Sequence, residues 1–221
     1  MPDGPAGDDG GAACEGVGEG DRERFGSHTG VSFITGDVET LGVVPGARFD
    51  AVHSRMTLML LADPVAGLAT IRRSIRPGGR LAATVFRDGG ANPWLPAAML
   101  GAAAYVGPLP PLPVGDEPEP FAFADPVRVK AFFTTAGYTD VEVGPHDVTL
   151  IAPDEPDTVA EWLIEIGPAG AAYRAAAPAD QAAARSGAAR LLERFREVGA
   201  GYRLPAGHWL ITATTDRTDE P

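Results

Sequence analysis

The sequence predicts an α/β fold whose helices pack on a sheet that contains parallel strands, and two observations lead to this class. Between residues 49 and 86, a strand pattern, an amphipathic helix, a glycine turn and a second strand pattern follow one another. Between residues 125 and 143, a helix that a glycine closes leads into a further strand pattern. Parallel strands need a crossover connection, usually a helix, so this order of elements is typical of an α/β protein.

Length and composition limit the class of protein further. The chain has 221 residues, which suits one α/β domain, and its hydrophobic fraction of 44% is enough for a core. Its formal net charge of −12 argues against a nucleic-acid partner, because an acidic surface repels a phosphate backbone. The one cysteine, Cys14, excludes an internal disulfide and a cysteine-based zinc cluster, and it fits a reducing cytoplasm.

The first thirty residues form a head that is rich in glycine and acidic side chains. They hold nine of the 28 glycines and seven acidic residues, against two arginines and one aromatic side chain. Such a segment buries too little apolar surface to offset its ordering entropy, so the head 1–30 is predicted to be disordered. It also lacks the basic start and apolar centre of a secretory signal, so export is not indicated and the cytoplasm is the expected location.

Ordered structure is expected from Val31 onwards. The predicted elements are, in order, strands at 31–34 and 49–53, a helix at 64–75, a strand at 80–86, a helix at 95–106, a helix at 126–136, a strand at 141–143, helices at 158–166 and 180–198, a strand at 208–213, and a frayed tail at 214–221. The strand at 31–34 rests on a β-branched and aromatic run that Gly36-Asp37 stops. The strand at 49–53 follows the turn-prone Pro45-Gly46.

The helix at 64–75 has the clearest start signal in the chain. Its apolar residues recur at helical spacing, Asp63 supplies an N-cap and Pro64 takes the first helical position. Pro77-Gly78-Gly79 is expected to end this helix before the buried strand at 80–86.

Residues 89–115 carry no charge over 27 positions, which is a length in the transmembrane range. Six prolines interrupt the run, so it is not expected to span a membrane. The segment, which includes Trp94, is equally consistent with a hydrophobic substrate lid and with an insertion into the core. Farther on, Asp125-Pro126 opens the helix that Gly137 closes.

Four stretches of the chain, taken in order, resemble one family. They are VSFITGDVETL (31–41), FDAVHSRMTLMLLADPVAGLATIRRSIRPGGRLAATVF (49–86), PFAFADPVRVKAFFTTAGYTDVEV (120–143) and GHWLITA (207–213). Together they resemble the class I S-adenosylmethionine-dependent methyltransferases, in the ubiquinone/menaquinone-type group that acts on small molecules. The similarity covers residues 31–213, and its most specific part is the second stretch.

The resemblance implies a Rossmann-like sheet whose strand ends hold S-adenosylmethionine. Asp37 and Val38 match the loop that approaches the adenine, where a carboxylate accepts from the exocyclic amine and a backbone N–H meets a ring nitrogen. Ser54, Arg55 and Met56 match the loop beside the methionine part of the cofactor. Gly36-Asp37 is equally consistent with a simple turn, without a role in binding. Arg55 is also consistent with a surface residue that forms an ion pair.

The family's glycine loop has a counterpart in this chain only in Gly16, Gly18 and Gly20. Glycine is frequent throughout the head, so this match is also expected by chance. Sixteen residues separate Gly20 from Asp37, which leaves no room for the helices and the strand that normally lie between them. The sheet is therefore predicted to be incomplete at its first two strands and to expose an edge there. A truncated gene product, a partner or second copy that covers the edge, and loss of the cofactor site are the competing explanations.

No side chain has the motif support of a catalytic base, although His53 stands at a strand end where a base could lie. The four histidines, His28, His53, His146 and His208, lack the spacing of metal ligands, so no metal is predicted.

Two functions stay open. The first is methyl transfer to a small, hydrophobic or aromatic molecule, with helical lid or substrate insertions at 89–126 and 151–204 of a domain at 31–213. The second is a non-catalytic accessory or binding protein of the same fold, or a truncated gene product that is unable to bind the cofactor.

Overall fold

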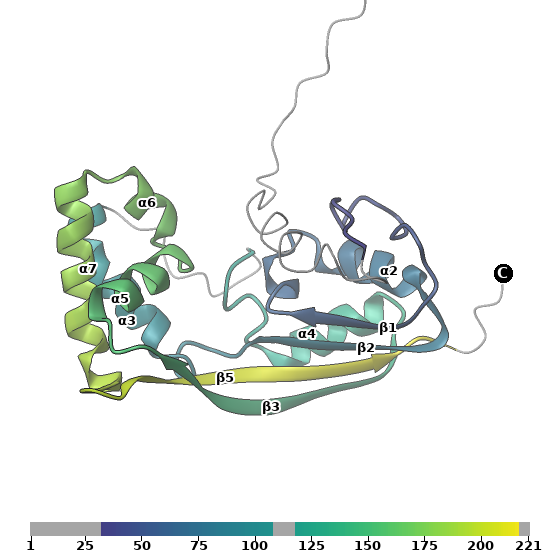
Figure 1. Cartoon of the computed structure of the whole chain (residues 1–221). Coiled ribbons are helices and arrows are strands. Elements are labelled where there is room, and N and C mark those ends of the chain that lie inside the picture. Colours follow the sequence, from purple (N-terminus) through teal and green to yellow (C-terminus); the bar gives the residue numbers. More distant parts are fainter. Residues whose placement is uncertain (1–31, 108–117, 217–221) are drawn as a thin grey trace, which may run out of the picture.

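The computed structural model describes residues 32–107 and 118–216, and its centre is a mixed five-stranded sheet (Figure 1). The strands lie in the order β1-β2-β5-β3, and the short β4 pairs with β5. β1 runs parallel to β2, whereas β5 is antiparallel to β2, β3 and β4. The strand bounds are β1 Phe49–Arg55, β2 Ile75–Phe86, β3 Thr139–Ala152, β4 Arg196–Glu197 and β5 Gly201–Thr214. The predicted α/β class is confirmed.

Helices fill the connections between these strands. The helices and 3₁₀ turns are η1 Leu58–Leu60, α2 Pro64–Ser74, α3 Trp94–Val106, α4 Pro126–Thr135, α5 Pro156–Glu165, α6 Gly170–Ala175, α7 Pro178–Leu192 and η2 Glu193–Phe195. The expected caps form: the Asp63 carboxylate accepts from the Ala66 N–H at 2.9 Å, and the Asp125 carboxylate accepts from the Val127 N–H at 2.9 Å. A proline in the first turn follows each cap, where its missing N–H costs nothing.

Two hydrophobic clusters make up the core of the described residues. In one cluster, α2 and α4 contact each other and cover one face of the sheet at β1, β2, the first half of β3 and the second half of β5. In the other, α3, α5, α6 and α7 form a helical group that packs on the opposite ends of β3 and β5. Figure 1 shows the helical group at one end of the long β5 strand, with α2 and α4 at the other.

β5 serves both clusters because its apolar alternation changes phase along the strand. In its first half the buried residues are Tyr202, Leu204 and Ala206, whereas in its second half they are Ile211 and Ala213. Successive side chains of a strand point to opposite faces, so the two clusters lie on opposite faces of the sheet. The change of phase falls near Gly207.

Within the helical group, α3 and α7 cross at two glycines. A side chain at Gly101 would overlap the backbone of Ala188, and one at Gly187 would overlap the carbonyl oxygen of Gly101. The two helices therefore approach more closely than helices with larger side chains could.

Several predicted boundaries are wrong. Residues 32–34 form no strand, since none of the described strands lies beside them to complete a ladder. Helix α2 ends at Ser74, and Pro77-Gly78-Gly79 belongs to β2, where Gly79 closely approaches the Asp50 carbonyl. The helix expected to reach residue 198 ends at Leu192.

The prediction that the tail frays from residue 214 is also wrong at its first residues. Thr215 is buried, and its side-chain hydroxyl donates to the Arg76 carbonyl at 2.8 Å. Other expectations fall outside the described residues: the head 1–30, its glycines Gly16, Gly18 and Gly20, and the proline-rich part of 108–114. In the part of the chain that the structure describes, no helix is long and apolar enough to cross a membrane.

Candidate functional site

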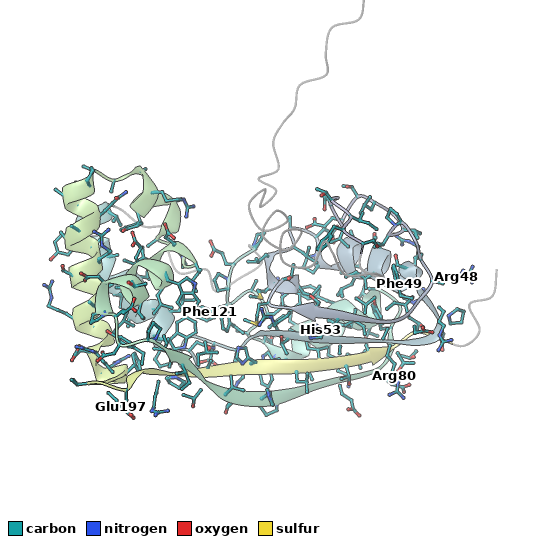
Figure 2. The ribbon with its side chains drawn as sticks, in the orientation of Figure 1. Arg48, Phe49, His53, Arg80, Phe121 and Glu197 are labelled. Carbon is teal, nitrogen blue, oxygen red and sulfur yellow. The ribbon has the colours of Figure 1, made fainter. Side chains whose placement is uncertain are left out.

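The carboxyl ends of β1 and β2 meet at the same edge of the sheet, as expected for two parallel neighbours. Their ladder runs in register to Arg55 opposite Thr84. Both strands end between α2 and the helical group, and Figure 2 shows His53 on β1 near this end and Phe121 beyond it. In open α/β sheets, ligands bind outside the carboxyl ends of the strands, so this edge is the candidate site.

The turn that follows β1 holds an unusual backbone conformation. Met56 has a φ of 59°, in the left-handed region that side-chain-bearing residues rarely adopt. Its N–H donates to the Thr84 carbonyl at 2.8 Å, and the Thr57 hydroxyl donates to the Arg55 carbonyl at 3.1 Å. The buried side chains of Leu58 and Met59 then anchor the turn in the core. Such strain persists only where the surrounding contacts enforce it, and it gathers at functional sites.

Asp37 is exposed and fixes its own turn. Its carboxylate accepts from the Glu39 N–H at 2.9 Å and from the Thr40 hydroxyl at 3.2 Å, so the turn interpretation of Gly36-Asp37 is correct for the local structure. The same geometry leaves the N–H of Val38 without an acceptor among the described residues. The side chains of Val38 and Met56 both pack against the hydrophobic cluster that contains α2.

Glu39 holds this segment in place, and the sequence analysis missed it. Its carboxylate accepts from the N–H groups of Ala62 and Asp63, at 2.8 and 2.9 Å. The segment after Asp37 is thereby attached to the chain that leads from β1 into α2. A glutamate two residues after Asp37 was the available signal, but its partners are more than twenty residues away.

The remaining predicted residues do not gather on one side of the sheet. The half-buried Ser54 lies opposite Ala83, whose side chain is in the core, so Ser54 faces the α2 side. His53 and Arg55 are exposed and alternate with Ser54, so both lie on the opposite face. Since β1 continues through Arg55, His53 lies within the strand and not at its end.

The loop that follows β2 is locked to β5. The Asp88 carboxylate accepts from the N–H groups of Gly90 and Ala91, at 2.8 and 3.1 Å. Asn92, which is fully buried, donates to the Gly207 carbonyl at 2.9 Å, and Gly207 in turn donates to Ala91. The Asn92 side-chain oxygen finds no partner among the described residues. The loop beside the site is therefore held to β5 by hydrogen bonds.

An aromatic cluster forms where β2 ends. Phe86 lies edge-on to Trp94 and to Phe121, with ring centroids 5.7 and 6.4 Å apart, and it stacks on His208 at 5.4 Å. Trp94 is 1% exposed and its indole N–H donates to the Pro205 carbonyl, so the core interpretation of this residue is correct. Burial lowers the pKa of His208 below its usual value, which keeps its ring neutral.

A cavity of about 170 Å³ opens beside this cluster, between the loop after β2 and the start of α4. Phe121, Ala122 and Ala124 supply its apolar lining, and Asp88 and Arg128 lie at its polar side. The segment that carries Phe121 is tied to the turn after β1, because the Glu119 N–H donates to the Met59 carbonyl at 3.1 Å. The cavity is thus connected to both strand ends.

The chemistry of the candidate site rests on carboxylates, backbone N–H groups and apolar surface. Within residues 32–107 and 118–216, no three His, Cys, Asp or Glu side chains come together as metal ligands. The arrangement can bind and orient small molecules. None of the described titratable side chains combines a cavity position with the partners of a catalytic base.

Comparison with known proteins finds a family match over part of the chain. Residues 15–83 match the family model of a methyltransferase domain. The matched segment begins directly before Gly16 and runs through Asp37, the β1 turn and α2 to Ala83. No curated protein sequence matches the chain.

Two solved structures with a TM-score of 0.50 share the fold at low sequence identity, and a third match scores lower. The YcgJ protein from Bacillus subtilis has a TM-score of 0.50 and 10% identity, over 90% of this chain and 77% of that chain. A protein described with the conversion of a disulfide bond into a thioacetal group during echinomycin biosynthesis has a TM-score of 0.50 and 17% identity, over 92% of this chain and 63% of that chain. A Bacillus halodurans protein assigned as a methyltransferase has a TM-score of 0.47 and 14% identity, over 88% and 77%.

The family match over residues 15–83, together with the fold shared with the two structures at a TM-score of 0.50, confirms the resemblance to class I S-adenosylmethionine-dependent methyltransferases. The family match covers less than half of the 221 residues, and this chain spans 63% of one structural relative. The ubiquinone/menaquinone-type subgroup stays a prediction.

Proposed function

We propose that the protein transfers a methyl group from S-adenosylmethionine to a small apolar or aromatic molecule. The observation that carries the proposal is the enforced left-handed turn at Met56, at the carboxyl end of β1 and inside the segment that matches a methyltransferase domain. Strain of this kind costs on the order of 1–3 kcal/mol, and a binding site is a common reason for its retention.

The groups beside this turn fit the cofactor. The Asp37 carboxylate is exposed and held by its own turn, so it can accept from an adenine amine. The Val38 N–H, which has no acceptor among the described residues, can donate to a ring nitrogen. When bound, S-adenosylmethionine supplies an electrophilic methyl group on a sulfonium. Ser54, Arg55 and Met56 remain the proposed neighbours of its methionine part, and Gly16, Gly18 and Gly20 the proposed glycine loop.

The cavity beside Phe121 supports an acceptor with an aromatic or short apolar end. Its volume of about 170 Å³ is close to that of cavities that hold a benzene ring. The locked loop after β2 would hold the acceptor in place, and the apolar lining would exclude water from the reaction. The helices at 89–126 and 151–204 are proposed to complete this side of the site.

Binding of S-adenosylhomocysteine tests the proposal directly. We expect heat on titration and a rise in the melting temperature, since a ligand that binds the folded state stabilises it. Asp37→Ala should weaken binding by roughly tenfold, because one charge-assisted hydrogen bond is lost. Glu142→Gln, on the distant strand β3, is the matched control and should bind as the wild type does. A wild type that gives neither heat nor a thermal shift would overturn the proposal.

A second function, a non-catalytic accessory protein of the same fold, is favoured by one observation. β1 pairs only with β2 among the described strands, so its other edge is open, and a second copy or another partner is proposed to cover it. A folded monomer that methylates a small molecule would contradict this alternative. A protein that assembles but gives no signal with either form of the cofactor would favour it.

A further inference from the structure

A groove of about 530 Å³ lies on the helical group, between the start of α3 and the end of α7. Its volume is within the range of clefts that hold small ligands. Pro96, Ala97 and Leu100 of α3 line it together with the preceding Pro93, and Leu191 of α7 lies across from them. The two helices contact each other within one hydrophobic cluster, so the groove is formed by the fold itself.

The apolar side chains of this groove are unusually open to water. Leu100 is 61% exposed and Leu191 is 45% exposed, and the two prolines beside them are half-buried. Single exposed apolar residues are common on protein surfaces, but exposed apolar residues that gather in one groove mark a binding surface. A ligand with an apolar body would remove these side chains from water.

The charged part of the lining consists of two arginines. Arg190 is in the last turn of α7 and Arg194 follows four positions later in η2, so the two lie near each other on one side of this helical segment. Neither forms an ion pair with any described residue, although the chain has 30 acidic side chains against 18 basic ones. The neighbouring Arg185 and Arg196, by contrast, are each paired with carboxylates.

The acidic residues that flank the lining in the sequence bind elsewhere. The Glu193 carboxylate accepts from the Arg196 guanidinium at 3.3 Å, and the Asp88 carboxylate accepts from the N–H groups of Gly90 and Ala91. Neither carboxylate is part of the described lining of the groove. The groove therefore combines apolar walls with two positive charges that no described carboxylate balances.

Both guanidinium groups have further contacts that keep them near the groove. Arg190 donates through Nη2 to the Tyr105 hydroxyl at 3.2 Å, and the Arg194 guanidinium lies 4.6 Å from the centre of the Phe195 ring. A guanidinium carries five N–H donors in a planar fork that matches a carboxylate, so each arginine keeps donors for a ligand.

We propose that the groove binds a small apolar molecule that carries a carboxylate. The carboxylate accepts charge-assisted hydrogen bonds from Arg190 and Arg194. The apolar body lies against Pro96, Leu100 and Leu191, and displaces water from them.

This site is separate from the cavity proposed for the methyl acceptor. Gly89 lines both, and a side chain there would meet the rings of Pro96 and Phe121 at 3.3 and 3.5 Å, so the chain at Gly89 lies between the two spaces. The inference therefore does not depend on the proposed methyl transfer.

Other classes of ligand fit the groove less well. Both arginines would repel a cation, and inorganic phosphate would leave the apolar walls in water. A long polyanion would meet the net charge of −12 of the whole chain. A neutral apolar molecule would fill the groove but give the two guanidinium groups no acceptor.

A titration of the isotope-labelled full-length protein, followed by nuclear magnetic resonance, tests the proposal. Octanoate, octanol and octylamine share one apolar chain and differ in charge. Octanoate is expected to shift the backbone signals of Gly89, Leu100 and Leu191 and to bind at least about tenfold more tightly than octanol, with octylamine weakest. Naphthoate extends the test to a rigid aromatic body, and binding of either acid at the groove supports the proposal.

Charge-removing variants test the role of the arginines. Arg190→Gln and Arg194→Gln should each weaken octanoate binding at least about fivefold and leave octanol binding within about twofold. Leu100→Asn should weaken both ligands, because it removes apolar contact. Arg80→Gln is the matched control, since it removes the same charge from an exposed residue at the far end of the sheet (Figure 2), and it should bind octanoate as the wild type does.

Two further measurements separate this site from folding and from methyl transfer. Circular dichroism should show each variant folded, and the groove variants should bind S-adenosylhomocysteine as the wild type does. Equal affinities for the acids and octanol, shifts confined to other parts of the chain, or equal losses in Arg80→Gln and Arg190→Gln would each overturn the proposal. A wild type that binds octanoate at the groove but not S-adenosylhomocysteine would overturn only the proposed methyl transfer.

Discussion

Met56, in the turn of the candidate site, has a backbone conformation that residues with a side chain rarely adopt. Its left-handed φ of 59° is enforced by the bond from its N–H to Thr84 and by the packing of its side chain under α2. Side chains that branch at Cβ tolerate this region worst, because the branch meets the neighbouring carbonyl. Met56→Ile should therefore lower the free energy of unfolding by about 1–2 kcal/mol relative to Met56→Leu, which has the same atoms without the branch.

Denaturant unfolding of the two variants measures this difference. The comparison removes most of the change in side-chain volume, so it isolates the backbone strain. Equal stabilities would show that the turn relaxes and that no strain is stored at the end of β1.

His208 makes the stability dependent on pH. Burial is the main cause that lowers its pKa below the unperturbed value of 6.5, while its ring stacks on Phe86. The unfolded chain therefore binds a proton more readily than the folded one, and stability is expected to fall as the pH drops below about 6.5. His208→Phe keeps the aromatic stack and removes the proton, so its unfolding free energy should depend less on pH between about 5 and 7. Identical pH profiles for the two proteins would contradict the assignment.

Among the elements, the α3–α7 helix pair has the least tolerance for added volume. Gly101→Ala should destabilise the protein by about 1–3 kcal/mol, because the added methyl group overlaps the backbone of Ala188. Gly144→Ala is the matched control, since nothing lies within 4 Å of its new carbon atom. Thermal unfolding should lower the melting temperature of the first variant clearly more than that of the second. A tolerated Gly101→Ala would mean that the two helices can move apart at little cost.

The elements also show how far sequence patterns reach in this chain. The helix at Pro64 and the strand that includes Val85 were predictable, because caps, proline positions and apolar periods are local signals. The first half of β5 was not, because Pro205 and Gly207 interrupt it and its apolar alternation changes phase there. The strand expected at 31–34 failed for the complementary reason: a β-branched run forms a strand only where another strand pairs with it.

In the candidate site, too, local sequence signals were predictable and contacts between distant segments were not. The family resemblance predicts Asp37, Val38 and Met56 as site residues, and the structure places Val38 and Met56 against one hydrophobic cluster. The role of Glu39 was not predictable, because it depends on backbone groups at 62 and 63 that only the folded chain brings near. The segregation of His53 and Arg55 from Ser54 follows from strand alternation, once β1 is known to continue through Arg55.

At the scale of the whole molecule, two hydrophobic clusters on opposite faces share the long strands β3 and β5. Phe86 packs against both clusters, so the contact between them is narrow. Units that share few buried side chains can open separately, and hydrogen exchange reports such openings. Leu163 of α5 and Leu68 of α2 are both buried and lie in different clusters, so truncating each of them perturbs one cluster at a time.

Leu163→Ala and Leu68→Ala should each cost about 2–5 kcal/mol by leaving a cavity in the core. If the clusters open separately, Leu163→Ala should speed amide exchange in α3, α5 and α7 and leave α2 and α4 protected, and Leu68→Ala should do the reverse. Exchange followed by mass spectrometry of peptides resolves the two regions. Equal acceleration in both regions for both variants would show a single cooperative unit. Separate opening would instead let the helical group move relative to the carboxyl ends of β1 and β2, beside the cavity that is proposed to hold the methyl acceptor.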